Sequence, residues 1–272
     1  MRMRKSSSDM RRRTTSRAIN IAVALAVVSA VTLAMVFTYG RRKVGPEVPV
    51  TAAPKPAPAA ETRMQLVKWF PFSDENSLNE WEEKVFKGKV VYRIESREDL
   101  SFVRATSDAA ASALYYKIKI DAKTRQPLVT WKWRVDKFPV KKNPENLEVQ
   151  NEDDFAARVY VIFTAGFILN SKVLEYVWTE TLPVGATGTS PYSKNIKLMV
   201  LESGRSEDGQ WRREERDILA DYRKMFGQSP ERDMGMVGFM TNTEHTETSA
   251  DAMYDDIKIG YREDTDKESK IK

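Results

Sequence analysis

Alternation of apolar and polar residues over short stretches is the feature that most restricts what this chain can fold into. In EDDFAARVYVIF, residues 152–163, Phe155 begins an apolar series on one side, while Asp154, Arg158 and Tyr160 fall on the other. A period of two residues is typical of a β-strand with one buried face. Because an extended chain rises about 3.3 Å per residue, Asp154 and Arg158 are expected roughly 13 Å apart, too far for a direct ion pair. Each is therefore expected to find its partner on a neighbouring strand, in a loop, in water or in a ligand.

The same alternation recurs in seven further stretches. LVTWKWRV places Trp131 and Trp133 on one face, and Lys132 and Arg134 on the other. Similar patterns predict strands over residues 89–96, 112–120, 174–181, 195–203, 234–242 and 253–261. Gly, Pro, Asn and Asp separate these segments, as expected of turns. The pattern predicts an all-β domain over residues 64–262, an antiparallel two-sheet sandwich of the jelly-roll type.

One segment has a different period. Apolar residues of WRREERDILADYRKMF, residues 211–226, follow a helical stripe, and Gly227 and Pro230 come directly after it. A single helix among eight predicted strands does not form a repeating βαβ pattern. We therefore expect one helix packed at the edge of the sandwich.

An uncharged apolar run precedes the domain. Residues 18–39 are long enough to cross the roughly 30 Å hydrocarbon core of a bilayer as a helix. Residues 1–17 are rich in Arg and Lys, so the positive-inside rule places this tail in the cytoplasm and the domain outside it. A signal peptide cleaved after Ala30 is the alternative, but the run continues to Phe37, which favours an uncleaved anchor. The sequence predicts a single-pass protein of the cell inner membrane with a periplasmic domain.

Two further segments flank the domain. Residues 40–63 are rich in Pro and Ala and are predicted to be an extended linker. Residues 263–272 are charged, show no apolar period, and are predicted to be a disordered tail.

Composition excludes several kinds of site. The chain has no Cys and one His, His245, which excludes thiol nucleophiles, iron–sulfur clusters and metal sites with several histidines. Residues 1–43 hold ten Lys and Arg residues against one acid, which leaves 34 basic and 38 acidic residues, a net charge of −4, for residues 44–272. The overall charge of +5 therefore comes from the tail that faces the membrane, and no nucleic-acid partner is expected.

Several motifs in one order resemble a known family. The series TWKWRVDKFP, EDDFAARVYVIF, LEYVW, ERDILADYRKMFG, MTNTEHT and MYDDIKI, within about residues 66–261, resembles the bacterial domain of unknown function 3047 family. The resemblance implies an envelope protein with a β-sandwich similar to carbohydrate-binding modules, and it implies no known activity. Where the family pattern has an acidic TDTDNT, this chain has TNTEHT over residues 241–246, so a cation site built from the family's acids lacks those ligands here.

No cofactor is expected. The candidate site for a structural Ca²⁺ ion is one stretch that offers oxygen ligands, Asn242, Glu244, Glu247 and Asp251. The spacing of these residues does not follow the pattern of a calcium-binding loop.

Aromatic rings beside charged side chains suit the recognition of a sugar, in which stacking and charged hydrogen bonds combine. Trp131 and Trp133 share a face with valines and are expected in the core instead. The candidate ligand-binding residues are therefore Lys132, Arg134, Asp154, Arg158, Tyr160 and Trp178.

The sequence favours a membrane-anchored, non-catalytic envelope domain that binds a glycan or another envelope polymer. An envelope hydrolase or lyase that uses Asp154, Arg158 and Asp256 is one alternative, although adjacent acids on a strand point to opposite faces. A scaffold domain that docks another envelope protein is the other. No residue is assigned a catalytic role.

Overall fold

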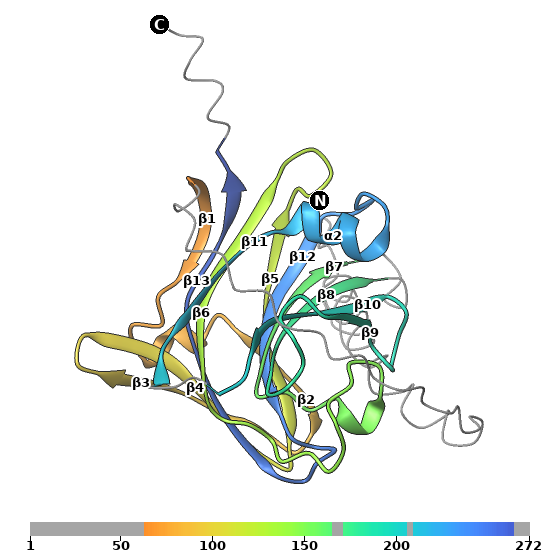
Figure 1. The fold of residues 1–272 in the computed structure, drawn as a ribbon. Coiled ribbons are helices and arrows are strands. Elements are labelled where there is room, and N and C mark those ends of the chain that lie inside the picture. Colours follow the sequence, from red (N-terminus) through yellow and green to blue (C-terminus); the bar gives the residue numbers. More distant parts are fainter. Residues whose placement is uncertain (1–62, 165–170, 206–208, 264–272) are drawn as a thin grey trace, which may run out of the picture.

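The computed structural model describes residues 63–164, 171–205 and 209–263, which form two β-sheets packed face to face with an α-helix at one end (Figure 1). The all-β, two-sheet architecture predicted from the alternation is confirmed. The predicted anchor, residues 18–39, and the predicted tail, residues 1–17, lie outside the described residues. Within the described residues, no helix has both the length and the apolar character needed to cross a membrane.

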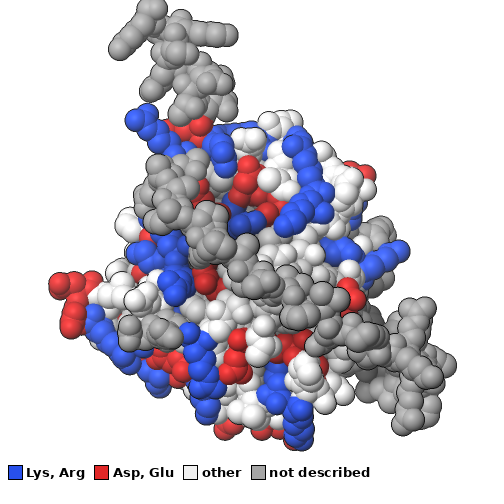
Figure 2. Space-filling view, viewed as in Figure 1, with Lys and Arg blue, Asp and Glu red and all other residues white. Residues whose placement is uncertain are grey.

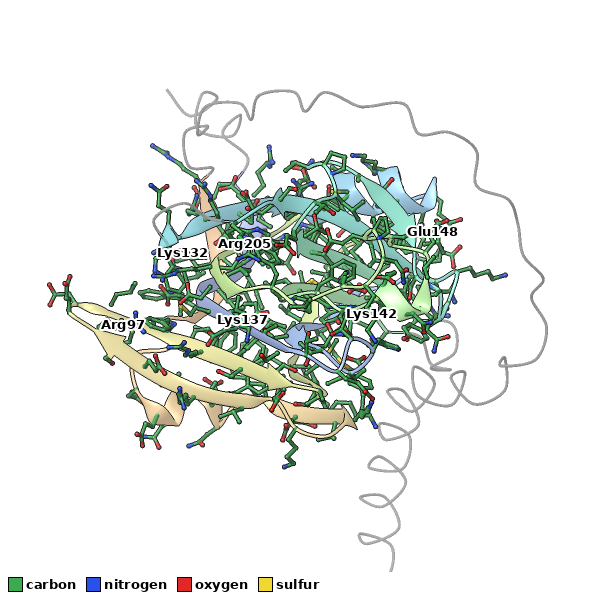
Figure 3. All side chains as sticks on the ribbon, turned by 60° about the horizontal axis from the view of Figure 1, so that its bottom comes forward. Arg97, Lys132, Lys137, Lys142, Glu148 and Arg205 are labelled. Atoms are coloured by element: carbon green, nitrogen blue, oxygen red, sulfur yellow. The ribbon has the colours of Figure 1, made fainter. Side chains whose placement is uncertain are left out.

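The first sheet has six strands, in the order β11-β6-β13-β4-β3, with β1 also paired to β13. The long strand β13 lies at its centre, paired to β6 along one edge and to β4 and then β1 along the other. The strands are β1 (Met64–Phe70), β3 (Val91–Arg97), β4 (Leu100–Asp108), β6 (Pro127–Lys137), β11 (Arg212–Asp217) and β13 (Ser249–Arg262). Figure 3 shows Arg97 at the tip of the hairpin of β3 and β4, which projects beyond the rest of the sandwich.

The second sheet has seven strands, in the order β2-β5-β12-β7-β8-β10-β9. They are β2 (Glu82–Lys87), β5 (Ala111–Ile120), β7 (Ala157–Phe163), β8 (Lys172–Thr179), β9 (Thr187–Thr189), β10 (Ile196–Ser203) and β12 (Met234–Asn242). β8 and β10 are parallel, so the expectation of a wholly antiparallel sandwich was wrong for this pair. Residues 180–195 carry the chain back to the end of the sheet at which β8 begins, as a parallel connection requires. Two short 3₁₀ helices, η1 (Glu75–Leu78) and η2 (Gln150–Glu152), lie in loops.

The core between the sheets is aromatic. Trp131 and Trp133 of β6 are fully buried. The ring centroid of Trp131 lies 5.4 Å from that of Tyr176, and the ring centroid of Trp133 lies 5.7 Å from that of Trp178, both on β8 in the facing sheet. The prediction that these two tryptophans are core residues is confirmed, as is the burial of alternate residues of β7, such as Val159. Figure 2 shows acidic and basic side chains interspersed over the visible surface.

The helix predicted over residues 211–226 was half wrong. The first part forms edge strand β11, paired to β6, and helix α2 spans only Ile218–Phe226. The carboxylate of Asp217 accepts a hydrogen bond from the Ala220 amide at 3.0 Å and so caps the first turn. Gly227, with a left-handed φ of 70°, ends the helix, as predicted. Trp211 fitted the helical spacing by chance, since it lies before β11, outside the helix, and packs on Phe102.

Candidate ligand-binding site

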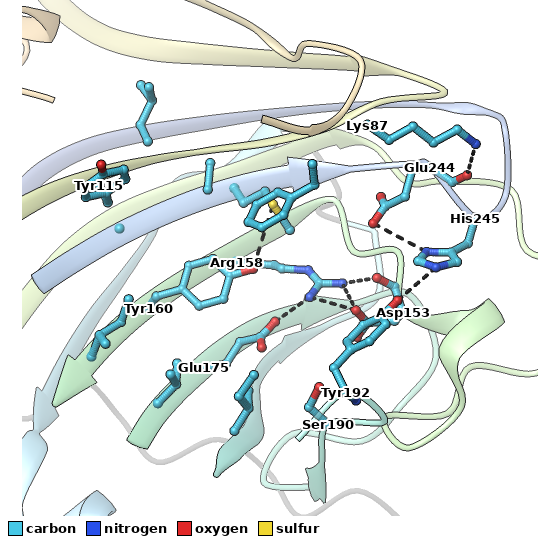
Figure 4. Close-up of a pocket in the computed structure, with 18 residues that line it drawn as sticks. Lys87, Tyr115, Asp153, Arg158, Tyr160, Glu175, Ser190, Tyr192, Glu244 and His245 are labelled. Atoms are coloured by element: carbon cyan, nitrogen blue, oxygen red, sulfur yellow. Dashed lines mark hydrogen bonds and ion pairs between the residues drawn. The ribbon is translucent and has the colours of Figure 1, made fainter. Parts of the chain in front are cut away.

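A cavity of about 370 Å³ opens on the outer face of the seven-stranded sheet, the face turned away from the core (Figure 4). It crosses six neighbouring strands, β2, β5, β12, β7, β8 and β10, and loop residues close its end. Arg158, Tyr160 and Ile162 of β7 all line it, since alternate residues of a strand share one face. The polar side of the stretch that begins at Glu152 is thus a cavity wall.

Most of the lining is apolar or aromatic. Three tyrosines from different elements, Tyr115, Tyr160 and Tyr192, stand around the cavity (Figure 4). A side chain at Gly238 would place its Cβ 2.8 Å from the Leu114 carbonyl oxygen, so a glycine is required where β12 passes β5. The apolar lining residues are Phe86, Ala113, Leu114, Ile162, Val173, Ile196 and Met240.

A buried arginine organises the polar part of the cavity. Nη1 of Arg158 donates to Oε1 of Glu175 at 2.6 Å and to Oδ2 of Asp153 at 3.3 Å, and Nη2 donates to the Asp153 carbonyl. Its guanidinium carbon also lies 4.6 Å from the ring centroid of Phe155. Phe155 is buried, as predicted, but it lies before β7 and packs in a second, smaller apolar cluster rather than with Val159 in the main one.

The carboxylates around Arg158 are held away from water. Burial raises the pKa of Glu175 to about 7, against the opposing effect of the Arg158 charge. Burial likewise raises the pKa of Asp153. Oδ1 of Asp153 and Nε of Arg158 are buried and have no hydrogen-bond partner among the described residues. The network therefore retains hydrogen-bonding capacity.

A second polar group lies at the loop end of the cavity. Nε2 of His245 is 2.9 Å from the Tyr192 hydroxyl, and Nδ1 is 3.3 Å from Oδ1 of Asp154. Asp154 also accepts hydrogen bonds from the Thr246 amide at 2.7 Å and the Asn242 side chain at 2.9 Å. Burial would raise the pKa of Asp154, but the interactions with the His245 side chain and then with Thr246 outweigh it and hold the pKa well below its usual range. Asp154 is therefore a fixed anion.

Glu244 completes this group. Its Oε1 lies 3.5 Å from Nδ1 of His245, and its Oε2 accepts from Asn242 at 2.8 Å. Burial and then the neighbouring Asp154 charge raise the pKa of Glu244 to about 7. Burial would lower the pKa of His245, but Asp154 and Glu244 raise it. Asp154, Glu244 and His245 thus form a cluster of three metal-ligating side chains whose ligand atoms lie within 4.8 Å of one another.

Three of the six predicted ligand-binding residues come together here. Arg158 and Tyr160 line the cavity, and Asp154 lies directly behind Glu244 and His245. As expected, Asp154 and Arg158 find separate partners, on a loop and on a neighbouring strand.

The other three do not line the cavity. Lys132 and Arg134 lie on β6 of the six-stranded sheet, where Nζ of Lys132 is 3.4 Å from Asp256 and Nε of Arg134 is 2.6 Å from Asp136. Trp178 is 1% exposed in the core, and its indole donates to the Gly204 carbonyl at 3.0 Å. Alternation separated the two faces of β6 correctly, but it could not tell which sheet carries the cavity.

The residues named for the hydrolase or lyase alternative and those named for calcium do not converge either. Asp256 lies on β13, where it accepts a hydrogen bond from the Trp69 indole at 2.8 Å, and it is not part of the cavity lining. The carboxylate of Asp251 forms an ion pair with Arg104 at 2.6 Å, and the carboxylate of Glu247 lies 3.6 Å from Nζ of Lys87. Neither alternative finds its residues assembled among those the structure describes.

Sequence reasoning did not select Glu175, Tyr192, Glu244 or His245 as ligand-binding residues. Glu175 and Tyr192 carried no motif, and both depend on which strands are neighbours. His245 was considered only as the single histidine of the chain, and Glu244 was considered only for calcium. The signal that could have found them is their position: residues 243–246 follow directly after β12, at the same end of the sheet as Asp154 before β7.

Residues 79–258 match the model of a family described as "Protein of unknown function (DUF3047)". The chain belongs to this family. The DUF3047 match includes every residue that lines the cavity, and it confirms the resemblance of the motifs. No curated protein matches the DUF3047 chain in sequence.

Solved structures similar to this DUF3047 protein include three glycan-related domains. The family 11 carbohydrate-binding module from Clostridium thermocellum, in complex with a β-1,3-1,4-mixed-linked tetrasaccharide, is 11% identical at a TM-score of 0.38, over 75% of this chain and 100% of the module. The xylan-binding CBM22-1 domain from Paenibacillus barcinonensis is 9% identical at a TM-score of 0.40, and the match covers 76% of this chain and 100% of that domain. The xyloglucanase domain of an effector from Sinorhizobium fredii is 10% identical at a TM-score of 0.38, and the match covers 67% of this chain and 93% of that domain. TM-scores of this size are too low to transfer a ligand or an activity.

Proposed function

We propose that this DUF3047 domain binds a glycan in the cavity of its seven-stranded sheet. The observation that carries the proposal is the lining itself: three tyrosines and the charged groups of Arg158 and Glu175 face one cavity of about 370 Å³. That volume lies in the range of about 300–1,000 Å³ that is typical of small-ligand sites.

The chemistry of the lining matches a sugar. The faces of sugar rings are apolar and pack on aromatic rings, which Tyr160 and Tyr192 offer. Sugar hydroxyls both donate and accept hydrogen bonds, and the cavity holds an arginine that donates and carboxylates that accept.

The domain is proposed to work in the bacterial envelope without catalysis. Residues 18–39 would anchor it in the inner membrane, residues 40–63 would extend it into the periplasm, and an envelope polymer would be its ligand. The uncharged run and the preceding Arg-rich tail support this placement.

The test is a binding screen of the full chain in detergent against soluble fragments of envelope and extracellular polysaccharides. A bound polymer is expected, and Tyr160→Ala is expected to weaken its binding at least tenfold. The matched control is Trp69→Ala, which removes a half-exposed ring on β1, in the other sheet. Absence of binding to every polymer, or equal losses in the two variants, would contradict the proposal.

A further inference from the structure

The cluster of Asp154, Glu244 and His245 has distances that fit metal ligands better than hydrogen-bond partners. Nδ1 of His245 is 3.3 Å from Asp154 Oδ1 and 3.5 Å from Glu244 Oε1. A charge-assisted hydrogen bond between such groups is about 2.7–2.9 Å long. Zinc bonds to nitrogen and oxygen are about 2.0–2.1 Å long, so two ligand atoms of a tetrahedral site lie about 3.3–3.4 Å apart.

The other ring nitrogen of His245 has a hydrogen-bond partner. Nε2 is 2.9 Å from the Tyr192 hydroxyl, so the tautomer with hydrogen on Nε2 donates there. In that tautomer the Nδ1 lone pair faces two carboxylate oxygens, an arrangement that is repulsive unless a cation lies between them. Metal-bound histidines commonly hold their second nitrogen in such a hydrogen bond.

The carboxylates are also oriented by neighbours. The Asn242 side-chain amide donates to Asp154 Oδ1 and Glu244 Oε2, at 2.9 and 2.8 Å, and the Thr246 amide holds Asp154 Oδ2. This leaves Oε1 of Glu244 turned toward the imidazole. Supporting hydrogen bonds of this kind are typical around metal ligands.

Negative charge is in excess around the cluster. Asp153 is 5% exposed, lines the same cavity, and interacts electrostatically with His245. Its Oδ1 is buried without a hydrogen-bond partner among the described residues. A buried, unpaired carboxylate oxygen is costly, and a nearby cation lowers that cost.

We propose that Asp154, Glu244 and His245 bind one divalent transition-metal cation of the zinc type. Three protein ligands leave a fourth position open, and it faces the cavity, because Glu244 and His245 line the cavity while Asp154 lies behind them. An imidazole ligand favours zinc-like ions over Ca²⁺, which takes oxygen ligands. The proposal goes beyond glycan binding and does not depend on it.

The experiment is a titration of the metal-stripped full chain, purified without a histidine tag, with Zn²⁺ and separately with Ca²⁺ by calorimetry. One Zn²⁺ per chain is expected to bind, at least tenfold more tightly than Ca²⁺. Glu244→Gln and His245→Gln are expected to weaken Zn²⁺ binding at least tenfold, and Glu247→Gln, an exposed acid of the same loop, is the matched control. Failure of Zn²⁺ to bind, or equal binding by all variants, overturns the proposal.

A second measurement uses the presence of only one histidine in the chain. Nitrogen NMR of histidine-labelled protein reports the two ring nitrogens of His245 without overlap. Zn²⁺ is expected to shift Nδ1 and leave Nε2 protonated. A ring protonated on both nitrogens with and without Zn²⁺ would mean that a proton fills the place of the metal, and the proposal would be wrong. Both measurements are made without a glycan, so their failure leaves glycan binding to its own test.

Discussion

Arg158 and Glu175 form an ion pair that runs diagonally across two neighbouring strands and is almost entirely buried. Glu175 of β8 stands opposite Tyr160 of β7, and its carboxylate reaches Nη1 of Arg158 at 2.6 Å. The side chains are only 3% and 4% exposed. Burial of both charges is expensive, so the pair persists because Asp153 and the Phe155 ring also contact the guanidinium.

Arg158→Met should destabilise the domain by about 3–5 kcal/mol, since it leaves two carboxylates buried without their cation. Chemical denaturation measures this loss. Arg93→Met, which removes an exposed arginine paired to Glu95 at 2.7 Å, should cost no more than about 1 kcal/mol. Equal costs would show that the buried network contributes no more than a surface pair.

Glu175 should make the free energy of unfolding fall as pH rises. Its pKa is raised from 4.5 to about 7 by burial, so the folded state binds a proton that the unfolded state has released over this range. The stabilising contribution is therefore complete below pH 4.5 and is lost as pH approaches 7. Glu175→Gln should remove this fall, on the order of 3 kcal/mol, from a plot of unfolding free energy against pH. Parallel curves for wild type and variant would contradict the assignment.

Trp178→Ala should lower stability by about 3–5 kcal/mol, because the ring is buried between the sheets against Trp133. The dissociation constant of the folded variant for any polymer bound by the wild type should stay within about twofold, since the ring does not line the cavity. Thermal unfolding and binding on the same sample distinguish the two effects. A large loss of affinity with unchanged stability would restore Trp178 as a ligand residue.

Asp217→Ala should cost about 1 kcal/mol, because it removes the side-chain acceptor at the start of α2. Asp217→Asn keeps an acceptor and should be close to neutral. Urea denaturation of both variants tests the boundary between β11 and α2. If both cost the same, the charge toward Arg262, 3.5 Å away, matters more than the cap.

The sequence predicted which side chains are buried where the burial depends on the two faces of a single strand. Alternation along β6 separated Trp131 and Trp133 from Lys132 and Arg134, because one strand's two faces meet different surroundings whatever the topology. It failed at residues 211–217, because every residue of edge strand β11 is charged and leaves no apolar signal. Strands β1, β2, β4, β9 and β11 were missed for want of a clear pattern.

The candidate site was recovered only in part, for a different reason. Arg158 and Tyr160 could be recognised because polar residues in an apolar strand need an explanation. Glu175, Tyr192 and Glu244 join them only through the order of strands in the sheet. That order depends on contacts between residues far apart in the chain, which local periods do not contain.

The two interior strands β12 and β13 are the last in sequence of the strands that the structure describes, and this bears on how the protein is made. β12 separates β5 from β7, and β13 separates β6 from β4 and β1. While a ribosome still holds residues 234–262, both sheets lack an interior strand, and the earlier strands cannot be joined into complete sheets. Pairing between strands so far apart in the chain is slow, so the nascent chain must stay free of aggregation until β12 and β13 have emerged. A stop codon that removes only the final two strands would therefore abolish the whole domain rather than trim its edge.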